Sequence, residues 1–189
     1  IQYAQESKGL NEPLIAIAEF CEGVLLDAGF VDEAYARYAV EATYATTNLA
    51  TFKAVAKKYP GIPKETILRD LVASQPGQEG KWFAAAKDAG FFELAIELAN
   101  KSPADPRTLI RAARDFAVKQ PAFAMAAGMT AFTGIMRGYG YDITGIDVLD
   151  TYAAVMLAAD AKGVDEATAK ENVRATIAAS GVGGVFVQR

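Results

Sequence analysis

A six-residue pattern occurs twice in this chain and constrains its fold more than any other feature. The first copy is GFVDEA at residues 29–34, and the second is GFFELA at residues 90–95. Glycine ends a helix in the left-handed conformation, acids favour the start of the next helix, and alanine lets two helices approach closely. Each copy therefore predicts a pair of antiparallel helices joined by a tight turn.

The rest of the chain has the apolar spacing of an all-α protein of about ten helices with short links, stacked as antiparallel hairpins. The seven prolines fall between the periodic stretches, as expected of helical architecture. Asp105-Pro106, Pro121, and Thr144 with Asp147 are start signals of three helices. We predict one all-helical domain over residues 1–180. The Gly-rich residues 181–189 have no helical period, and we expect a flexible end, an added strand, or the truncated edge of a longer protein.

Two further helices carry specific expectations. A helix over residues 81–89 leads into the second turn. The first helix, from residue 12 or 13 to residue 28, has apolar residues at helical spacing, which predicts that they face the core. These core residues are Leu14, Ile17, Ala18, Cys21, Leu25 and Ala28.

The composition excludes several classes of function. A net charge of -4 and a pI near 5.0 oppose a general affinity for nucleic acid or anionic lipid and leave room only for a local basic patch. The chain has no histidine, which excludes zinc sites built from Cys and His and nucleophiles activated by His. We expect no metal, no cofactor and no catalytic residue.

Localisation is constrained by the single cysteine and by the longest apolar run. Cys21 cannot form an internal disulfide, so no oxidising compartment is implied. Residues 123–136 are nearly apolar but fall short of the roughly 20 residues that span a bilayer, which favours a central core helix. We expect a cytoplasmic protein without a membrane span. Because the chain begins at Ile1 rather than Met, we expect that its native start is missing, through removal of a signal peptide or from a longer parent protein.

The repeated pattern resembles the helix-to-helix turn of tetratricopeptide repeats. The two copies are 61 residues apart (90 minus 29), which is not twice the family period of about 34 residues, and residues 46–78 lack the signature. The resemblance implies a tetratricopeptide-like α-solenoid or an irregular helical bundle, without assigning peptide-binding residues. The matching residues are Gly90, Phe92, Ala95 and Ile96 in one copy, and Gly29, Asp32, Glu33 and Ala34 in the other.

Three arginines form the first candidate site. Arg107, Arg111 and Arg114 are spaced i, i+4 and i+7, which predicts a basic row opposite the apolar face of their helix. Since Arg can hold an oxyanion with two hydrogen bonds, the row indicates a groove for an acidic peptide or a phosphate. The alternative is a solvated outer face in which Arg111 pairs with Asp115.

Lysines surround Tyr59 in a second basic cluster. Proteins that bind nucleic acid interleave aromatic and basic residues so that bases can stack. The alternative is that Tyr59 belongs to the core and the lysines to an exposed face, in keeping with the acidic pI. The cluster consists of Lys53, Lys57, Lys58 and Lys64.

Three aromatic residues are the remaining candidates. Trp82 is the only tryptophan, either a binding anchor or a residue that fills the seam between hairpins. Tyr139 and Tyr141 alternate with glycines, a composition suited to adaptable contacts. The alternative is a loop whose rings fold back over the apolar helix.

These features favour a non-catalytic scaffold of helical hairpins that binds another protein or peptide, alone or as one part of a longer protein. A second hypothesis is a helical domain that binds a small molecule or lipid, or an enzyme that needs no histidine. In it, residues 123–136 line a cavity with Arg137 and Tyr139 at its mouth. The third is nucleic-acid binding through the lysine cluster or the arginines.

Overall fold

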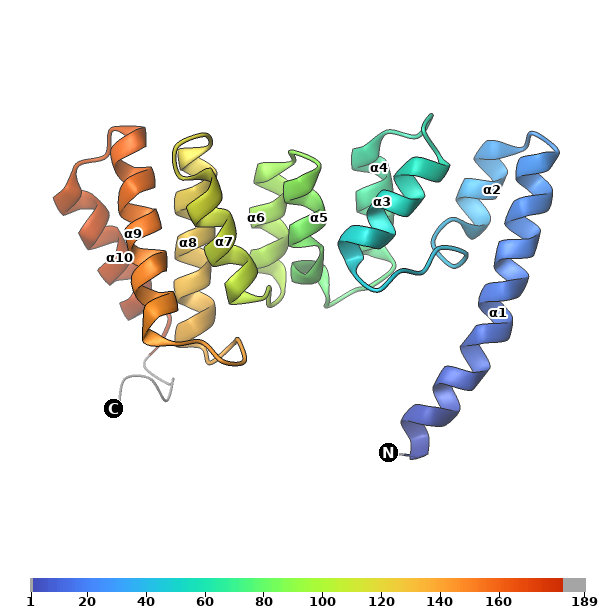
Figure 1. Ribbon diagram of the computed structural model, residues 1–189, viewed down its shortest axis with the longest axis horizontal. Coiled ribbons are helices and arrows are strands. Elements are labelled where there is room, and N and C mark those ends of the chain that lie inside the picture. Colours follow the sequence, from blue (N-terminus) through green and yellow to red (C-terminus); the bar gives the residue numbers. More distant parts are fainter. Residues whose placement is uncertain (1, 182–189) are drawn as a thin grey trace. The chain divides into compact units, whose positions relative to one another are not determined.

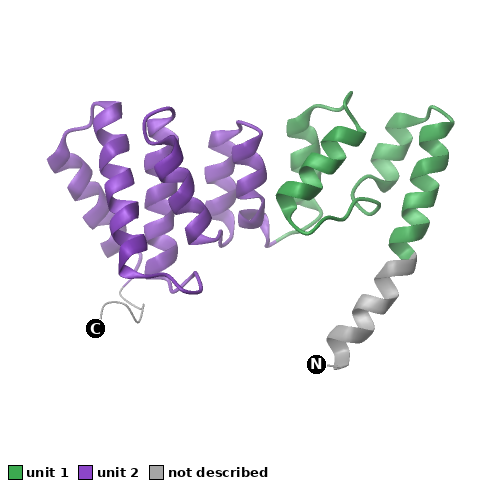
Figure 2. Ribbon diagram, in the orientation of Figure 1, with its two compact units in different colours: residues 1–76 green, residues 77–189 purple. Residues whose placement is uncertain are grey.

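The computed structural model describes the backbone of residues 2–181 and the side chains of residues 14–181. This part of the chain is all-α, with ten α-helices, one short 3₁₀ helix and no strand (Figure 1). Contacts gather the helices into two compact units, residues 1–76 and 77–189 (Figure 2), and each is described by itself. The single domain expected over residues 1–180 stays a prediction, and tail residues 182–189 lie outside the described part.

Unit 1 contains two pairs of consecutive helices, α1 with α2 and α3 with α4, each pair in contact. Thr47 caps α3 by accepting a hydrogen bond from the backbone N–H of Ala50, 3.1 Å away, which satisfies a donor that the first helical turn leaves free. The helices are α1 (Gln2–Asp27), α2 (Val31–Tyr38), α3 (Asn48–Lys58) and α4 (Lys64–Ala73). α1 begins earlier than the sequence predicts, at Gln2 rather than at residue 12 or 13.

Unit 2 contains the remaining six α-helices and the 3₁₀ helix. α5 packs against α6, α6 and α7 each pack against α8, and α8 packs against α9. α7 also contacts α9, and α10 contacts both α8 and α9. Pro106 and Pro121 open α7 and α8, and Thr144 and Asp147 form the expected capping box at the start of α9. The helices are α5 (Phe83–Asp88), α6 (Phe92–Lys101), α7 (Pro106–Phe116), α8 (Pro121–Met136), α9 (Gly145–Lys162) and α10 (Glu166–Ala179).

The helix predicted over residues 81–89 is divided. A 3₁₀ helix, η1 (Glu79–Trp82), precedes α5. The backbone N–H of Gly80 donates a 2.8 Å hydrogen bond to Ser102 Oγ. A Cβ on Gly80 would lie 2.3 Å from the Ser102 carbonyl oxygen. A tight turn therefore holds the start of this segment against the backbone that follows α6, where a regular helical turn was expected.

Both copies of the repeated pattern form the predicted joint. Gly29 and Gly90 adopt the left-handed conformation with φ of 82° and 83°. The following N–H groups reach back to close the helix, from Phe30 to the Leu25 carbonyl at 2.8 Å and from Phe91 to the Ala86 carbonyl at 2.9 Å. This is the Schellman arrangement. The alanine of each copy, Ala34 or Ala95, is fully buried, so the prediction of two closely packed helix joints is confirmed.

The apolar helix α8 lies in the core of unit 2, as predicted. Its Phe123 packs against the rings of Phe92 and Phe116 at centroid distances of 4.8 and 5.5 Å. Further along, a Cβ on Gly128 would lie 2.3 Å from Val155 Cγ2 of α9, so α8 and α9 approach as closely as glycine permits. Across residues 2–181, no helix combines the length and apolar character that crossing a membrane requires.

The predicted core face of α1 is wrong for three of its residues. Ala18 is buried at 8% exposure, but Ile17 is 59% exposed, and Leu14 and Ala28 are exposed as well. α1 carries apolar residues on two faces, and the face turned inward includes the acidic residue Glu22. The outward face forms an exposed apolar row, which we call the α1 row: Leu14, Ile17, Phe20 and Val24.

Glu22 is the centre of a polar network in unit 1. Its carboxylate is only 3% exposed and accepts hydrogen bonds from Lys58 Nζ at 2.7 Å and the Tyr59 hydroxyl at 2.5 Å. Lys58 Nζ also lies 3.1 Å from Thr43 Oγ1. A buried carboxylate needs such partners because its desolvation is otherwise costly. The network thus ties α1 to the end of α3.

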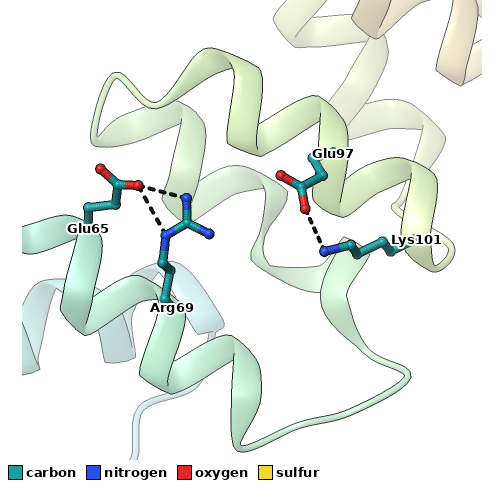
Figure 3. A network of polar contacts seen from close by, with 4 residues as sticks. All are labelled: Glu65, Arg69, Glu97 and Lys101. Atoms are coloured by element: carbon teal, nitrogen blue, oxygen red, sulfur yellow. Dashed lines mark hydrogen bonds and ion pairs between the residues drawn. The ribbon is translucent and has the colours of Figure 1, made fainter.

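Surface ion pairs follow the usual helical spacing in both units. Arg69 pairs with Glu65 on α4 at 2.7 Å, and Lys101 pairs with Glu97 on α6 at 2.5 Å (Figure 3). Each pair joins residues four apart, and both partners are about half exposed. Such pairs contribute only about 0.3–0.5 kcal/mol each. They support single helices and do not determine the fold.

Candidate functional site

The three candidate arginines lie on one exposed face of α7, as the spacing predicts. Their guanidinium groups differ in their partners. Arg107 donates to the carbonyl oxygen of Asp142, and Arg111 Nη2 lies 3.3 Å from Thr108 Oγ1. Arg114 pairs with Asp115 at 2.9 Å, so the pair expected between Arg111 and Asp115 is replaced by one with Arg114.

Arg107 also connects α7 to the start of α9. Hydrogen bonds from the Thr144 backbone N–H and hydroxyl lower the pKa of Asp147, and the positive charge of Arg107 lowers it further. Asp147 is therefore held as a carboxylate at the N-terminus of α9, where negative charge is favourable. The basic face of α7 thus begins beside the first turn of α9.

The neighbouring helix α9 presents an exposed apolar row that the sequence analysis did not identify. Ile146, Leu149 and Leu157 are each at least half exposed and share one face, with Ala153 between them. We call these three residues the α9 row. Since α7 and α9 contact each other, this row lies on the helix next to the three arginines. The opposite side of α9 is also apolar, so periodicity alone gave no reason to single out the row.

A shallow hollow lies between α9 and α10, with a volume of about 450 Å³. Its lining includes Met156 of α9 and Val164 of the connecting turn, and the Glu166–Lys170 pair belongs to the same hollow. The hydrogen bond in this pair lowers the pKa of Glu166 and raises that of Lys170. The lining combines apolar side chains with the charged residues Asp160, Glu166 and Lys170, a combination that can accept apolar side chains of a partner.

Tyr139 and Tyr141 both lie in the turn that follows α8, but their side chains differ in exposure. Tyr141 is 91% exposed, whereas Tyr139 is 41% exposed and lies close to Gly134 of α8, where an added Cβ would be 3.9 Å from Tyr139 Cδ2. Gly138 and Gly140 have φ of 80° and 96°, which supplies the sharp reversal. One tyrosine therefore folds back over the apolar helix and the other extends from the surface.

Trp82 does not lie on the surface. Its side chain is 1% exposed, and its Nε1 has no hydrogen-bond partner among the described residues. The burial of Trp82 agrees with the interpretation that it fills the core, and its ring is not accessible to a partner in this structure. A tryptophan near a helix start has the same sequence context in either role.

The lysine cluster does not present an aromatic ring. Tyr59 is fully buried, and Lys58 is engaged by Glu22 and Thr43. The other members, Lys53, Lys57 and Lys64, are exposed. A base therefore cannot stack on Tyr59. The structure has the alternative arrangement, with Tyr59 in the core and most of the lysines on an exposed face.

A polar pocket of about 200 Å³ lies at the C-terminal end of α8. Arg137 and Tyr139 belong to its lining, where the sequence analysis expected the mouth of a cavity. Only the last turns of the apolar helix reach it, through Thr130, Thr133 and Gly134. We call it the Arg137 pocket. Among the residues whose side chains the structure describes, no group of three His, Cys, Asp or Glu side chains is arranged to hold a metal ion.

Comparison with known proteins identifies no relative. No protein-family model, no curated protein and no solved structure matches this chain.

Proposed function

We propose that this chain is a non-catalytic protein-binding module, and that its unit 2 binds an acidic amphipathic helix of a partner across α7 and α9. The observation that carries the proposal is the α9 row, Ile146, Leu149 and Leu157, exposed on the helix that packs against the arginine-bearing α7.

The apolar part of the surface sets the form of the partner. Water-exposed aliphatic side chains that share one helix face mark interaction sites more often than scattered ones do. The α9 row lies along one helix, so it complements the apolar stripe of another helix, whose anchors recur at i, i+3, i+4 and i+7. The hollow between α9 and α10 offers room for one further apolar anchor of the partner.

The arginines of the surface determine which charge the partner should carry. The chain is acidic overall, at -4, yet the exposed face of α7 carries three arginines. Arg111 is bonded only weakly, to the Thr108 hydroxyl, and its fork of donors suits a carboxylate. A partner with Glu or Asp beside its apolar stripe is therefore favoured over a basic one.

The architecture supports the same proposal by analogy. We propose that the hairpins are tetratricopeptide-like repeats with an irregular period, because both joints have the glycine and alanine of that family's turn and the second also has its aromatic residue, Phe92. Stacked helical hairpins expose extended lateral surfaces, which such proteins use for binding. The analogy concerns the fold alone, and the α7–α9 surface stands on its own residues.

The test uses a fluorescent synthetic helix with Leu at i, i+4 and i+7 and Glu on both flanks, titrated with the whole chain. We expect saturable binding that weakens at least about tenfold in the Leu149→Ser/Leu157→Ser variant and in Arg111→Glu. Ile17→Ser is the matched control, since Ile17 is similarly exposed but lies on α1 of unit 1, outside the proposed surface. A peptide with Lys in place of Glu should bind at least about tenfold more weakly than the acidic one.

Two results would overturn the proposal. One is acidic-peptide affinity that is the same in the wild-type chain and both variants. The other is a dimer, seen by light scattering, that dissociates in Leu149→Ser/Leu157→Ser, because the row would then be a self-association surface.

A further inference from the structure

The α1 row is an apolar surface on unit 1 that the proposed function does not use. Its four side chains, Leu14, Ile17, Phe20 and Val24, are between 51% and 72% exposed. Another side of α1 packs against α2 and is bonded through Glu22 to the end of α3. Exposed apolar side chains that share one face of a helix mark a contact surface. The row is therefore a surface that another element should cover.

The helix α10 provides a contrast within the same chain. Glu171, Asn172 and Arg174 are exposed on it, and none of the large apolar side chains that the structure describes on α10 is exposed. In a stack of helical hairpins, a helix face that no neighbour covers has to be polar for the protein to stay soluble. The outer face of α10 meets this requirement and that of α1 does not, which favours the α1 row as a contact.

The spacing of apolar residues along this face is that of a contact between two helices. Leu14, Ile17, Cys21 and Val24 follow one another at steps of three, four and three, which are the steps between the a and d positions of a heptad. Cys21 is partly exposed between members of the row. The steps read the same in both directions. A second copy of α1 that runs antiparallel therefore presents the same pattern, as an isologous contact requires.

Antiparallel pairing matches large side chains with small ones. With a two-fold axis midway between Ile17 and Cys21, Ile17 lies opposite Cys21 of the second copy. In the same way, Leu14 lies opposite Val24 of the second copy. Phe20, the most exposed member of the row at 72%, flanks the contact next to the axis and meets the same ring of the second copy. Large side chains set against small ones fill a contact without voids, and a pair of aromatic rings adds to its stability.

The charges of α1 select the antiparallel orientation. The last turn of α1 carries Asp27 and no base, and the helix C-terminus adds partial negative charge there. A parallel pair would bring two such ends together. In the antiparallel pair, the two Asp27 residues are about 24 Å apart along the axis, at 1.5 Å per residue. The residues of the row and Cys21 are uncharged, so no like charges oppose each other along the contact.

We propose that two copies of this chain pair through the α1 row, antiparallel about a two-fold axis between Ile17 and Cys21. The proposal is independent of the partner surface on α7 and α9, which belongs to the other unit. The contact covers only about two heptads, so we expect a dissociation constant on the order of 100 μM. Denaturant unfolding at a few micromolar therefore reports on the monomer.

Sedimentation velocity of the whole chain, over a range from about 5 to about 500 μM, measures the association. We expect a dimer at the upper end of this range. The dissociation constant should rise at least about tenfold in Ile17→Ser/Phe20→Ser, because both side chains lie at the centre of the contact. Leu149→Ser/Leu157→Ser is the matched control. It also replaces two exposed apolar side chains, but outside the α1 row, and should dimerise like the wild-type chain.

Cys21, the only cysteine of the chain, reports on the orientation. In the antiparallel contact it lies opposite Ile17 of the second copy and is displaced by about 6 Å along the axis from the other Cys21. A disulfide needs Cα atoms within about 7 Å of each other, so oxidation should cross-link Ile17→Cys at least about tenfold faster than the wild-type chain. Ile17→Cys/Cys21→Ser should cross-link as slowly as the wild-type chain. Non-reducing electrophoresis measures the covalent dimer.

Three results would overturn the proposal. A monomer at the highest concentration would leave the row to a different protein or to a lipid surface. A dimer that Ile17→Ser/Phe20→Ser leaves intact would place the contact elsewhere on the chain. Faster cross-linking of the wild-type chain than of Ile17→Cys would indicate a parallel pair. Ile17 and Phe20 are exposed, so circular dichroism should show an unchanged fold, and a loss of the dimer then reports on the contact.

Discussion

The hydroxyl of Tyr59 donates a 2.5 Å hydrogen bond to the buried carboxylate of Glu22. Tyr59 is the C-cap residue of α3 and is fully buried, so this bond fixes the end of α3 against α1. Its ring also meets Tyr35 of α2 edge-on at 5.2 Å, and the Tyr35 hydroxyl donates to Asp70 of α4 at 2.6 Å. Two tyrosines and two acids thus connect all four helices of unit 1.

Removal of the central carboxylate should weaken the fold. We expect Glu22→Ala to lower the free energy of unfolding by about 2–3 kcal/mol, because the Tyr59 hydroxyl stays buried without an acceptor. The loss stays below that of a fully buried pair because Lys58 is 32% exposed. Glu19→Ala, an exposed change on the same helix, should alter it by less than about 0.5 kcal/mol. Denaturant unfolding compares them, and equal losses would contradict the network.

The same network predicts how stability depends on alkaline pH. Burial raises the pKa of Tyr59 above its ordinary value of 10.0, and the hydrogen bond to Glu22 raises it further. The pKa of Tyr35 is raised in the same way by burial and by Asp70. In the unfolded chain both tyrosines lose their protons near pH 10, whereas the folded chain retains them. Their contribution to stability is therefore complete below about pH 10 and is lost as the pH rises above it.

Ultraviolet titration of tyrosinate measures this directly. Of the eight tyrosines, Tyr35 and Tyr59 should stay protonated well above pH 10, for as long as circular dichroism shows a folded chain. Tyr59→Phe should remove one of these late-titrating groups, and Tyr44→Phe, at an exposed position, should leave both in place. Ionisation of all eight tyrosines together in the folded chain would contradict the prediction.

Two glycines of α8 should respond to alanine with opposite signs. A Cβ on Gly128 would lie 2.3 Å from the stiff side chain of Val155, so Gly128→Ala should cost about 1–3 kcal/mol by forcing α8 and α9 apart. A Cβ on Gly134 would lie 3.6 Å from Pro106 Cγ, an ordinary contact. Gly134→Ala should stabilise by about 0.5–1 kcal/mol through helix propensity. Thermal unfolding measures the stability of both variants. An equal loss of stability in the two variants would contradict the predicted difference in packing.

Neighbouring residues on α1 provide a test of which face is turned inward. Ile17→Ser should change the free energy of unfolding by no more than about 0.5 kcal/mol, because Ile17 is exposed. Ala18→Leu should cost about 1–3 kcal/mol, because Ala18 is buried and a larger side chain overfills the contact. Denaturant unfolding measures both losses. A larger loss for Ile17→Ser than for Ala18→Leu would support the core face predicted from the sequence instead.

Features of the fold that depend on adjacent residues were predictable. Both helix joints, the Asp105 cap of α7 and the capping box of Thr144 and Asp147 follow from a few neighbouring residues whose hydrogen bonds are local. The burial of α8 followed from its uniform apolar character. In these cases the local preference and the tertiary packing agree.

The inward face of α1 was not predictable from spacing. Both faces of the helix are apolar, and the one chosen contains Glu22, whose partner Lys58 is 36 residues away in sequence. The sequence gives no sign of that pairing, because an acid at such a position is ordinarily exposed. The same ambiguity hid the α9 row, since α9 is also apolar on more than one side.

The candidate site was predictable in part. The spacing of Arg107, Arg111 and Arg114 placed them on one face, and Arg137 and Tyr139 were expected at the mouth of a cavity. The polar lining of that pocket was not expected, because Asn100 and Ser102 reach it from another hairpin. Such a site depends on how the helices pack, which no single segment encodes.

The two helix joints have one consequence for how a chain of this kind can vary. α1 has 26 residues and α5 has six, yet the glycines that follow them differ by only 1° in φ and close their helices with the same hydrogen bonds. The geometry of the joint is therefore contained within its own few residues and does not depend on the length of the helix before it. Whole helical turns can be gained or lost ahead of such a joint, so the reach of a hairpin is free to change while its closure stays the same.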